Sequence, residues 1–320
     1  MDQITSTEKK LSNIKDIIKD FLFHCRYEKN LSDKTINAYT TDLNQFSGFI
    51  SESINMEIKE NLKAYLQNIS HFQPKTIKRK VATLKALFNH LEFENDDFIN
   101  PFRKMKVRIK EPKILPEVMT MDEVRKILLL LSKDLKNNKF DGKYTYKAQT
   151  RNLAVIELLF ATGIRVSELC NLRESDVDIK HGIIKVLGKG RKERIIQVCN
   201  SETLLILKNY YSLYRNQIKE RNIFFINRLN APLSSQSVRL LVKSYVKKAG
   251  LSKKISPHTF RHTFATLLLE EDVDIKYIQS LLGHSSIMTT QIYTHVSSEK
   301  QKKILSAKHP RRKLKLYECE

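Results

Sequence analysis

The chain has 320 residues, 41% of them hydrophobic, which is more than one hydrophobic core usually serves and therefore predicts two domains. It has no apolar run of about 18 residues, no signal peptide at its start and no Cys-x-x-Cys pair among Cys25, Cys170, Cys199 and Cys319, which argues against a membrane protein, a disulfide framework and a structural zinc site. The net charge of +22 favours a polyanionic partner, although a Lys-rich composition could also reflect an AT-rich genome.

The positive charge is unevenly distributed along the chain. Residues 1–100 contain 14 Lys and Arg against 14 Asp and Glu, whereas residues 101–320 contain 43 against 21. The whole excess therefore belongs to the second part of the chain. We expect a reduced protein in the cytoplasm, associated with the nucleoid.

Residues 1–102 are predicted to form an all-helical unit of about four helices. Apolar residues recur there at helical spacing, as in the stripes Ile14, Ile17, Ile18, Phe21, Leu22 and Ile77, Val81, Leu84, Phe88. The helix with the second stripe is expected to end at Asn100-Pro101.

The last helix of this unit is expected to have a basic face. The residues that stand off its apolar stripe are Lys75, Lys78, Arg79, Lys80 and Lys85. Such a face could lie along a phosphate backbone. A merely solvated face explains the same pattern equally well.

Residues 103–116 are predicted to be a basic, extended linker. From Phe102 to Pro116 the chain has six Lys or Arg residues and two further prolines after Pro101. A second domain, residues 117–303, follows. It opens with the capping-box spacing Thr120 to Glu123, and its first helical series continues to Ala161 and stops at Gly163.

A small antiparallel sheet is predicted between Asp176 and Val198. Two short β-branched runs, Gly182 to Leu187 and Arg194 to Val198, flank a polar turn that contains Lys189, Arg191 and Lys192. Helices are expected from Ser201 to about Lys303. Residues 304–320 would be a tail, basic and mobile from Lys308 onward.

Five short motifs contain residues suited to chemistry on an anion. They are ATGIRVSEL from Ala161, LGKGRKER from Leu187, SPHTFRHTFAT from Ser256, LLGHSS from Leu281 and QIYTH from Gln291. Taken singly, most have a structural explanation, such as a helix-end cation at Arg165 or a packed histidine at His284. His258 and Arg261 are more informative, because their spacing places both side chains on one helix face.

Together, the motifs resemble the catalytic set of the tyrosine recombinases, the family of phage integrases and Xer recombinases. The matching residues are Arg165, Lys189, His258, Arg261, His284 and Tyr293. The resemblance implies a mainly α-helical protein with a small antiparallel sheet, in which a helical, SAM-like core-binding domain and a catalytic domain form a C-shaped clamp on DNA.

The resemblance also implies a mechanism. Tyr293 would attack a phosphodiester and form a 3′-phosphotyrosine, Lys189 would protonate the leaving 5′-oxygen, and His258 and His284 would assist. Two permanently charged guanidiniums, Arg165 and Arg261, suit the negative charge that develops on the phosphate oxygens.

Glu168, one turn after Arg165, would orient these cations; the alternative is an ordinary exposed helix glutamate. We expect no cofactor and no metal, because the chain has no phosphate-binding glycine loop and no cluster of carboxylates.

The expected partners are a double-stranded DNA recombination site and further copies of the chain, in a tetramer on two sites. By resemblance, the tail would dock on a neighbouring subunit through Ile304 and Leu305, with Lys308, Arg311, Arg312, Lys313 and Lys315 facing acidic or phosphate surfaces. Alternatively, the tail would only add nonspecific DNA affinity. Two other functions compete with recombination, a type IB topoisomerase and a catalytically silent DNA-binding regulator.

Overall fold

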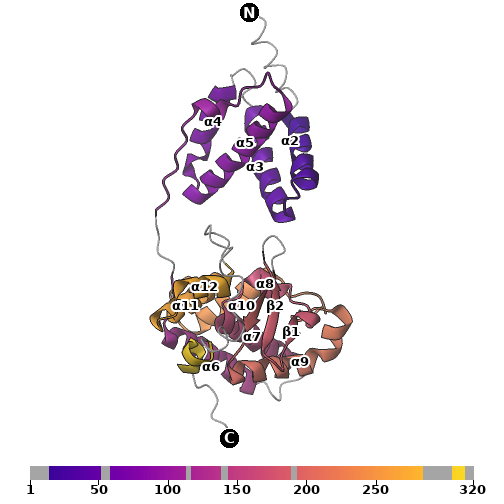
Figure 1. The fold of residues 1–320 in the computed structure, drawn as a ribbon, viewed down its shortest axis with the longest axis vertical. Coiled ribbons are helices and arrows are strands. Elements are labelled where there is room, and N and C mark those ends of the chain that lie inside the picture. The colour runs from indigo at the N-terminus through magenta and orange to yellow at the C-terminus, as the bar shows by residue number, and fades with distance from the viewer. Residues whose placement is uncertain are drawn as a thin grey trace, which may run out of the picture. The chain divides into compact units, whose positions relative to one another are not determined.

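The computed structural model describes residues 14–51, 58–112, 117–137, 143–188, 193–283 and 305–313. The chain divides into two compact units, Met1–Ile114 and Leu115–Glu320 (Figure 1). Each unit has its own hydrophobic core. Within the described ranges, no helix is both long enough and apolar enough to cross a membrane.

In the described residues of the first unit there are four α-helices, which confirms the predicted helical class. They are α2 (Ile14–Phe23), extended by a π-helical turn (His24–Glu28), α3 (Asp33–Ser51), α4 (Ile58–Asn68) and α5 (Pro74–Glu94). Short 3-10 turns follow α4 (Ile69–His71) and precede the extended segment (Pro101–Lys104). The predicted apolar stripes face inward, so that Phe21 and Leu84 are almost fully buried.

Helix α5 ends earlier than its sequence pattern indicates. Its last residue is Glu94 rather than Asn100, and Pro101 instead opens a short 3-10 turn that the Asn100 side chain caps. Residues 105–112, which follow this turn, form no helix or strand. Met105, Val107 and Ile109 among them nevertheless pack against the first core.

The basic face predicted on α5 is correct only in part. Lys75 is exposed, but Lys80 is buried and donates to Asp42 Oδ1 at 3.1 Å. The prediction that Lys80 stands off the apolar stripe is therefore wrong. Because Asp42 is only 1% exposed, it requires a cation beside it, and Lys80 supplies one from inside the unit.

The second unit is organised around α7, a helix that is buried over most of its length. Its elements are α6 (Met121–Asn137), α7 (Lys143–Thr162), α8 (Val166–Cys170), α9 (Ser201–Arg221), α10 (Ser235–Lys248), α11 (Pro257–Glu270) and α12 (Ile275–Leu282). Helix α7 packs against α6, α9 and α11. The predicted capping box is confirmed: Thr120 Oγ1 accepts from the Glu123 N–H, and Glu123 Oε2 accepts from the Thr120 N–H.

The predicted small sheet is also present. It has three antiparallel strands in the order β1 (Val177–Asp178), β2 (Ile183–Leu187) and β3 (Glu193–Gln197). The two longer strands lie within one residue of their predicted bounds, and the last pair in their register is Leu187 with Glu193. Ile184, Val186 and Ile196 point into the core, so one face of the sheet covers the helices.

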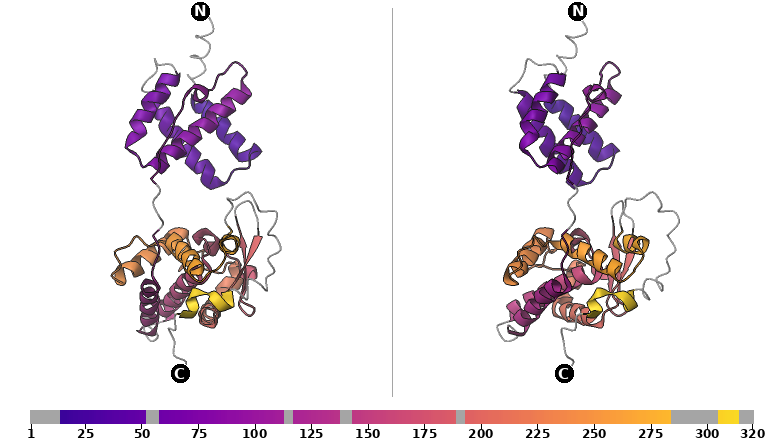
Figure 2. Two further views of the ribbon diagram at one scale, coloured as in Figure 1. Left: turned by 60° about the vertical axis from the view of Figure 1, so that its left-hand side comes forward. Right: turned by 90° about the vertical axis from the view of Figure 1, so that its left-hand side faces the viewer.

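Residues 305–313, here called the C-terminal segment, form part of the second unit. Leu305 is 2% exposed and packs in a cluster with α11 and α12, and both views of Figure 2 show the segment in yellow against this unit. His309 Nε2 donates to the Ala161 carbonyl at 2.7 Å. Burial, together with the nearby Arg311 charge, lowers the pKa of His309 to about 4. The prediction of a mobile tail is therefore wrong for these residues.

Arg311 anchors the C-terminal segment through a buried ion pair. Its Nη2 lies 2.9 Å from Glu157 Oε1 on α7 and 2.7 Å from Glu202 Oε2 on α9. The side chains of Arg311 and Glu157 are both 0% exposed. Arg311 is therefore not available to an acidic or phosphate surface on another molecule. The prediction that it faces such a surface is wrong.

We predict that Arg311→Met lowers the free energy of unfolding by about 3–5 kcal/mol, because it leaves Glu157 buried without its cation. Urea denaturation of the full chain measures this. The matched control is Lys313→Met, which removes a 63% exposed cation paired with Glu271 and should cost less than about 1 kcal/mol. A loss in Arg311→Met no larger than in this control would contradict a structural role for the buried pair.

Candidate active site

The first arginine of the site lies at a break between two helices. Helix α7 ends because Gly163 adopts φ +58°, and a Cβ there would lie 2.7 Å from Phe264 and 2.8 Å from Leu282. Arg165 then caps α8, and its backbone N–H donates to Glu168 Oε2 at 3.0 Å. The same carboxylate accepts from Arg165 Nη1 at 2.8 Å. Glu168 is buried, so its reading as an ordinary exposed glutamate is wrong.

The second arginine, Arg261, reaches the same place from α11. Its side chain is 6% exposed, and it donates through Nη1 to the Gly163 carbonyl at 2.8 Å. His258, one helical turn earlier, is exposed near the start of α11. Arg165 and Glu168 at the start of α8 therefore lie beside Arg261 of α11, an element far away in the sequence.

A third arginine, Arg194 on β3, was not predicted to belong to the site. It donates two hydrogen bonds of 2.8 Å to Glu168, from Nη1 to Oε1 and from Nη2 to Oε2. The sequence motif from Leu187 contains this residue, but its partner Glu168 lies 26 positions away. The signal that could have found it is a basic residue on a predicted strand at the base of the Lys189 turn.

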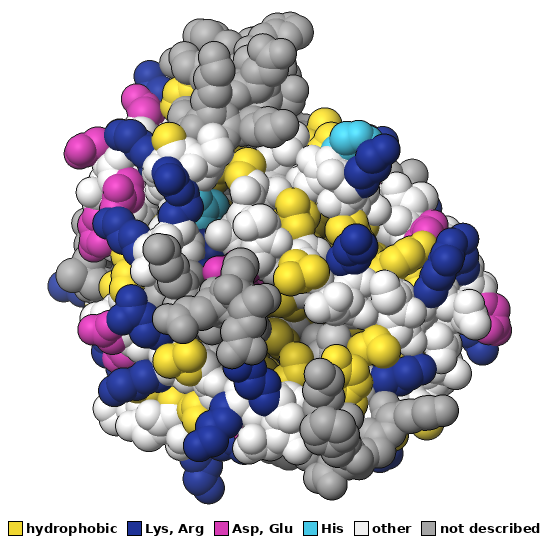
Figure 3. Space-filling view, turned by 90° about the horizontal axis from the view of Figure 1, so that it is seen from below, with side chains coloured by type: hydrophobic (Ala, Val, Ile, Leu, Met, Phe, Trp, Pro, Cys, Tyr) yellow, Lys and Arg dark blue, Asp and Glu magenta, His cyan; other side chains and the backbone are white. Residues whose placement is uncertain are grey.

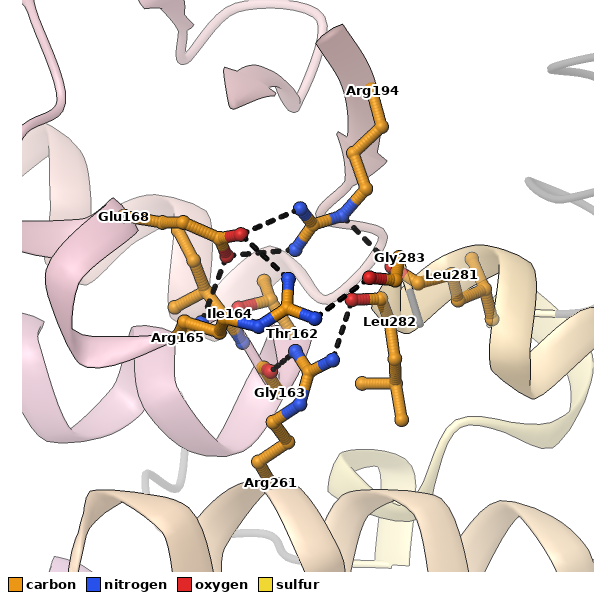
Figure 4. A network of polar contacts seen from close by, with 10 residues as sticks. All are labelled: Thr162, Gly163, Ile164, Arg165, Glu168, Arg194, Arg261, Leu281, Leu282 and Gly283. Carbon is orange, nitrogen blue, oxygen red and sulfur yellow. Dashed lines mark hydrogen bonds and ion pairs between the residues drawn. The ribbon is translucent and has the colours of Figure 1, made fainter. Parts of the chain in front are cut away.

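All three guanidiniums converge on the C-terminal end of α12 (Figure 4). Arg194 Nε donates to the Leu281 carbonyl at 3.2 Å, Arg261 Nη2 to Leu282 at 2.5 Å, and Arg165 Nη2 to Gly283 at 2.7 Å. A helix leaves its last carbonyls without intrahelical partners, and its dipole makes that end negative. Three cations can therefore bind three consecutive carbonyls there.

Burial and neighbouring charges shift the pKa values of Glu168 and Arg261. Burial would raise the pKa of Glu168, but hydrogen bonds and charge from Arg194, with those from Arg165, lower it to about 2. Burial, followed by the charges of Arg165 and Arg194, lowers the pKa of Arg261 to about 9. At neutral pH the site thus holds three guanidiniums and one carboxylate.

This arrangement is suited to holding an anion. An arginine has five N–H donors, and the bonds described above use two of those on Arg261 and two on Arg165. The remaining donors of two converging guanidiniums match the oxygens of a phosphodiester. Within the described ranges, no group of three or more His, Cys, Asp or Glu residues could hold a metal ion.

Five of the predicted site residues fall outside the part of the chain that the structure describes. They are Lys189, Arg191, Lys192, His284 and Tyr293. Three of them lie next to described positions: Lys189 follows Gly188 after β2, Lys192 precedes Glu193 at the start of β3, and His284 follows Gly283 at the end of α12. On the face seen in Figure 3, Lys and Arg side chains are spread among apolar and neutral ones.

Comparison with known proteins identifies the family. Residues 117–300 match the phage integrase family, and residues 18–95 match the phage integrase N-terminal SAM-like domain. The chain belongs to the phage integrase family of tyrosine recombinases. The predicted family, fold class and recombinase activity are thereby confirmed.

Several relatives match nearly the whole chain. A tyrosine recombinase of Agathobacter rectalis is 45% identical over 94% of this chain and 99% of its own length. XerC of Thermodesulfovibrio yellowstonii is 36% identical, over 94% and 98%, and XerD of Listeria innocua is 35% identical, over 92% and 99%.

Solved structures support the fold. The XerH site-specific recombinase bound to a palindromic difH substrate, in a post-cleavage complex, gives a TM-score of 0.67 at 23% identity, over 88% of this chain and 82% of that one. A lambda integrase dimer bound to a core site gives 0.59 at 22% identity, over 84% and 95%.

We predict that Glu168 stabilises the folded state only while it is ionised. Because its folded pKa is depressed to about 2 from 4.5, its contribution is fully present above the unfolded value and is lost as the pH falls toward 2. Between pH 5 and pH 3, the wild type should lose about 2 kcal/mol more unfolding free energy than Glu168→Gln. Urea denaturation at several pH values measures this, and equal losses in both proteins would contradict it.

Proposed function

We propose that this recombinase cuts and rejoins DNA through a transient covalent bond between Tyr293 and a 3′-phosphate. The observation that supports this most is the convergence of Arg165 and Arg261 beside Glu168. Tyr293 attacks the phosphorus, the bond to the 5′-oxygen breaks, and a 3′-phosphotyrosine and a free 5′-hydroxyl result. Attack by another 5′-hydroxyl reverses the step and joins new strands.

The two arginines stabilise the charge that this step creates. Negative charge grows on the two non-bridging oxygens of the phosphate as the tyrosine oxygen approaches. Guanidiniums fixed beforehand by backbone carbonyls need no rearrangement to meet that charge. Loss of either arginine should therefore slow cleavage by about 10²- to 10³-fold.

The remaining predicted residues transfer protons or bind the phosphate. Lys189 gives a proton to the 5′-oxygen as it leaves, since an alkoxide is a poor leaving group. His258 and His284 bind the phosphate or help Tyr293 to lose its proton. The phosphotyrosine keeps the energy of the broken diester, so resealing consumes no nucleotide.

The DNA is held by basic residues of both units in this proposal. Lys75, Lys78 and Arg79 on α5 and Arg191 and Lys192 beside Lys189 contact phosphates, whereas the buried Lys80 does not. Four copies assemble on two recombination sites in the cytoplasm, at the nucleoid, for integration, excision or dimer resolution. In the single chain, Leu305 and Arg311 are buried within their own unit.

The nucleophile is tested by Tyr293→Phe, which removes one hydroxyl group. A nicked suicide substrate traps the covalent adduct, and denaturing gels detect it. The variant should bind the site as the wild type does and form no adduct. Adduct formation by the variant would show that another residue is the nucleophile, and its absence from the wild type would favour a silent DNA-binding regulator.

The general acid is tested by Lys189→Ala. Cleavage of normal DNA should slow by about 10²- to 10⁴-fold, because the leaving oxygen receives no proton. A strand with a 5′-bridging sulfur has a better leaving group, so this variant should recover on it. Arg261→Ala is the matched control, because it should remain slow on both strands. Equal failure of Lys189→Ala on both substrates would rule out its role as acid.

A further inference from the structure

Arg194 differs from the other two arginines in how its nitrogens are used. All three of them bond to the protein: Nε to the Leu281 carbonyl, and Nη1 and Nη2 to the two oxygens of Glu168. Its side chain is only 14% exposed. A hydrogen bond to the protein from every nitrogen, together with this low exposure, suits a residue that fixes its neighbours rather than one that holds the phosphate.

The bonds of Arg194 connect three separate elements of the site. Arg194 lies on β3, where it pairs with Val186 on β2, near the strand ends that flank the segment containing Lys189. Its carboxylate partner Glu168 belongs to α8 and also binds Arg165. Its carbonyl partner Leu281 belongs to the end of α12, three residues before His284.

The C-terminal end of α12 lies very close to the Arg194 side chain. Gly283 adopts φ +64°, and a Cβ there would lie 3.1 Å from Arg194 Cδ and 3.2 Å from its Nε. A side chain at position 283 would thus be strained by its backbone and would also press on Arg194. The carbonyl of Gly283 accepts a hydrogen bond from Arg165, so this residue contacts both arginines.

We infer that Arg194 is a positioning residue for DNA cleavage: through Glu168 and the end of α12, it sets Arg165 relative to the strand that leads to Lys189. The inference rests on the proposed function. A lysine cannot replace it, because an ammonium is one point charge without the planar fork that binds both carboxylate oxygens. The charge of Arg194 also contributes to the lowered pKa of Arg261.

The test is Arg194→Lys, assayed by single-turnover adduct formation with saturating protein on a nicked suicide substrate. We expect the rate constant to fall by about 10- to 100-fold, the cost of slight misplacement in an active site. The apparent Kd for the site should stay within about 3-fold of the wild type, because no phosphate contact is lost. A rate constant within about 2-fold of the wild type would overturn the inference.

Two controls separate positioning from a general effect of charge. Lys185→Met removes a positive charge from an exposed position on β2 and should leave the rate constant within about 2-fold. In a double-mutant cycle, Arg194→Lys and Glu168→Gln should together slow cleavage by clearly less than the product of their separate effects. Independent effects would show that Arg194 does not act through Glu168 and would overturn the inference.

A second variant applies if Arg194→Lys does not fold. Gly283→Ala keeps every charge and displaces Arg194, so it should also slow the cleavage step by about 10-fold or more without weakening binding. A wild-type rate in this variant would overturn the inference. If the wild type forms an adduct and Tyr293→Phe does not, the proposed function stands even where the inference about Arg194 fails.

Discussion

The site depends on packing three positive guanidiniums into a small, largely buried space. Arg165, Arg194 and Arg261 repel one another, and each would lower the stability of the fold without a counter-charge. One carboxylate, Glu168, and three consecutive carbonyls at the end of α12 supply that negative potential. The geometry of the helix end therefore decides where each arginine lies, and the break at Gly163 allows α8 and α11 to meet it.

Arg165, Glu168 and Arg261 could be predicted from the sequence because the motifs together resemble those of the tyrosine recombinases. The helical spacing of His258 and Arg261 supported that prediction but did not carry it alone. Arg194 was missed because its importance arises from a partner 26 positions away, which only the register of the sheet brings into reach. The roles of Lys189, His284 and Tyr293 remain predictions.

The incorrect expectations for Lys80 and Arg311 have one physical origin. Lys80 and Arg311 were treated as surface residues because they are basic and lie in basic stretches. Each instead meets a buried carboxylate, Asp42 or Glu157, from a distant helix. Composition and periodicity cannot reveal such a pair, since the carboxylates look like ordinary helix residues in the sequence. The fold class was predictable because hydrophobic periodicity, capping residues and the glycine stop are local signals.

The burial of Arg261 has a consequence for how the enzyme responds to salt. Mobile ions screen exposed charges at distances near the Debye length, but they screen a buried group such as Arg261, which is 6% exposed, much less. The exposed basic residues that we propose to contact DNA phosphates would remain subject to counterion release. Ionic strength will then govern how long the protein stays on DNA, and will hardly change how fast a bound strand is cut.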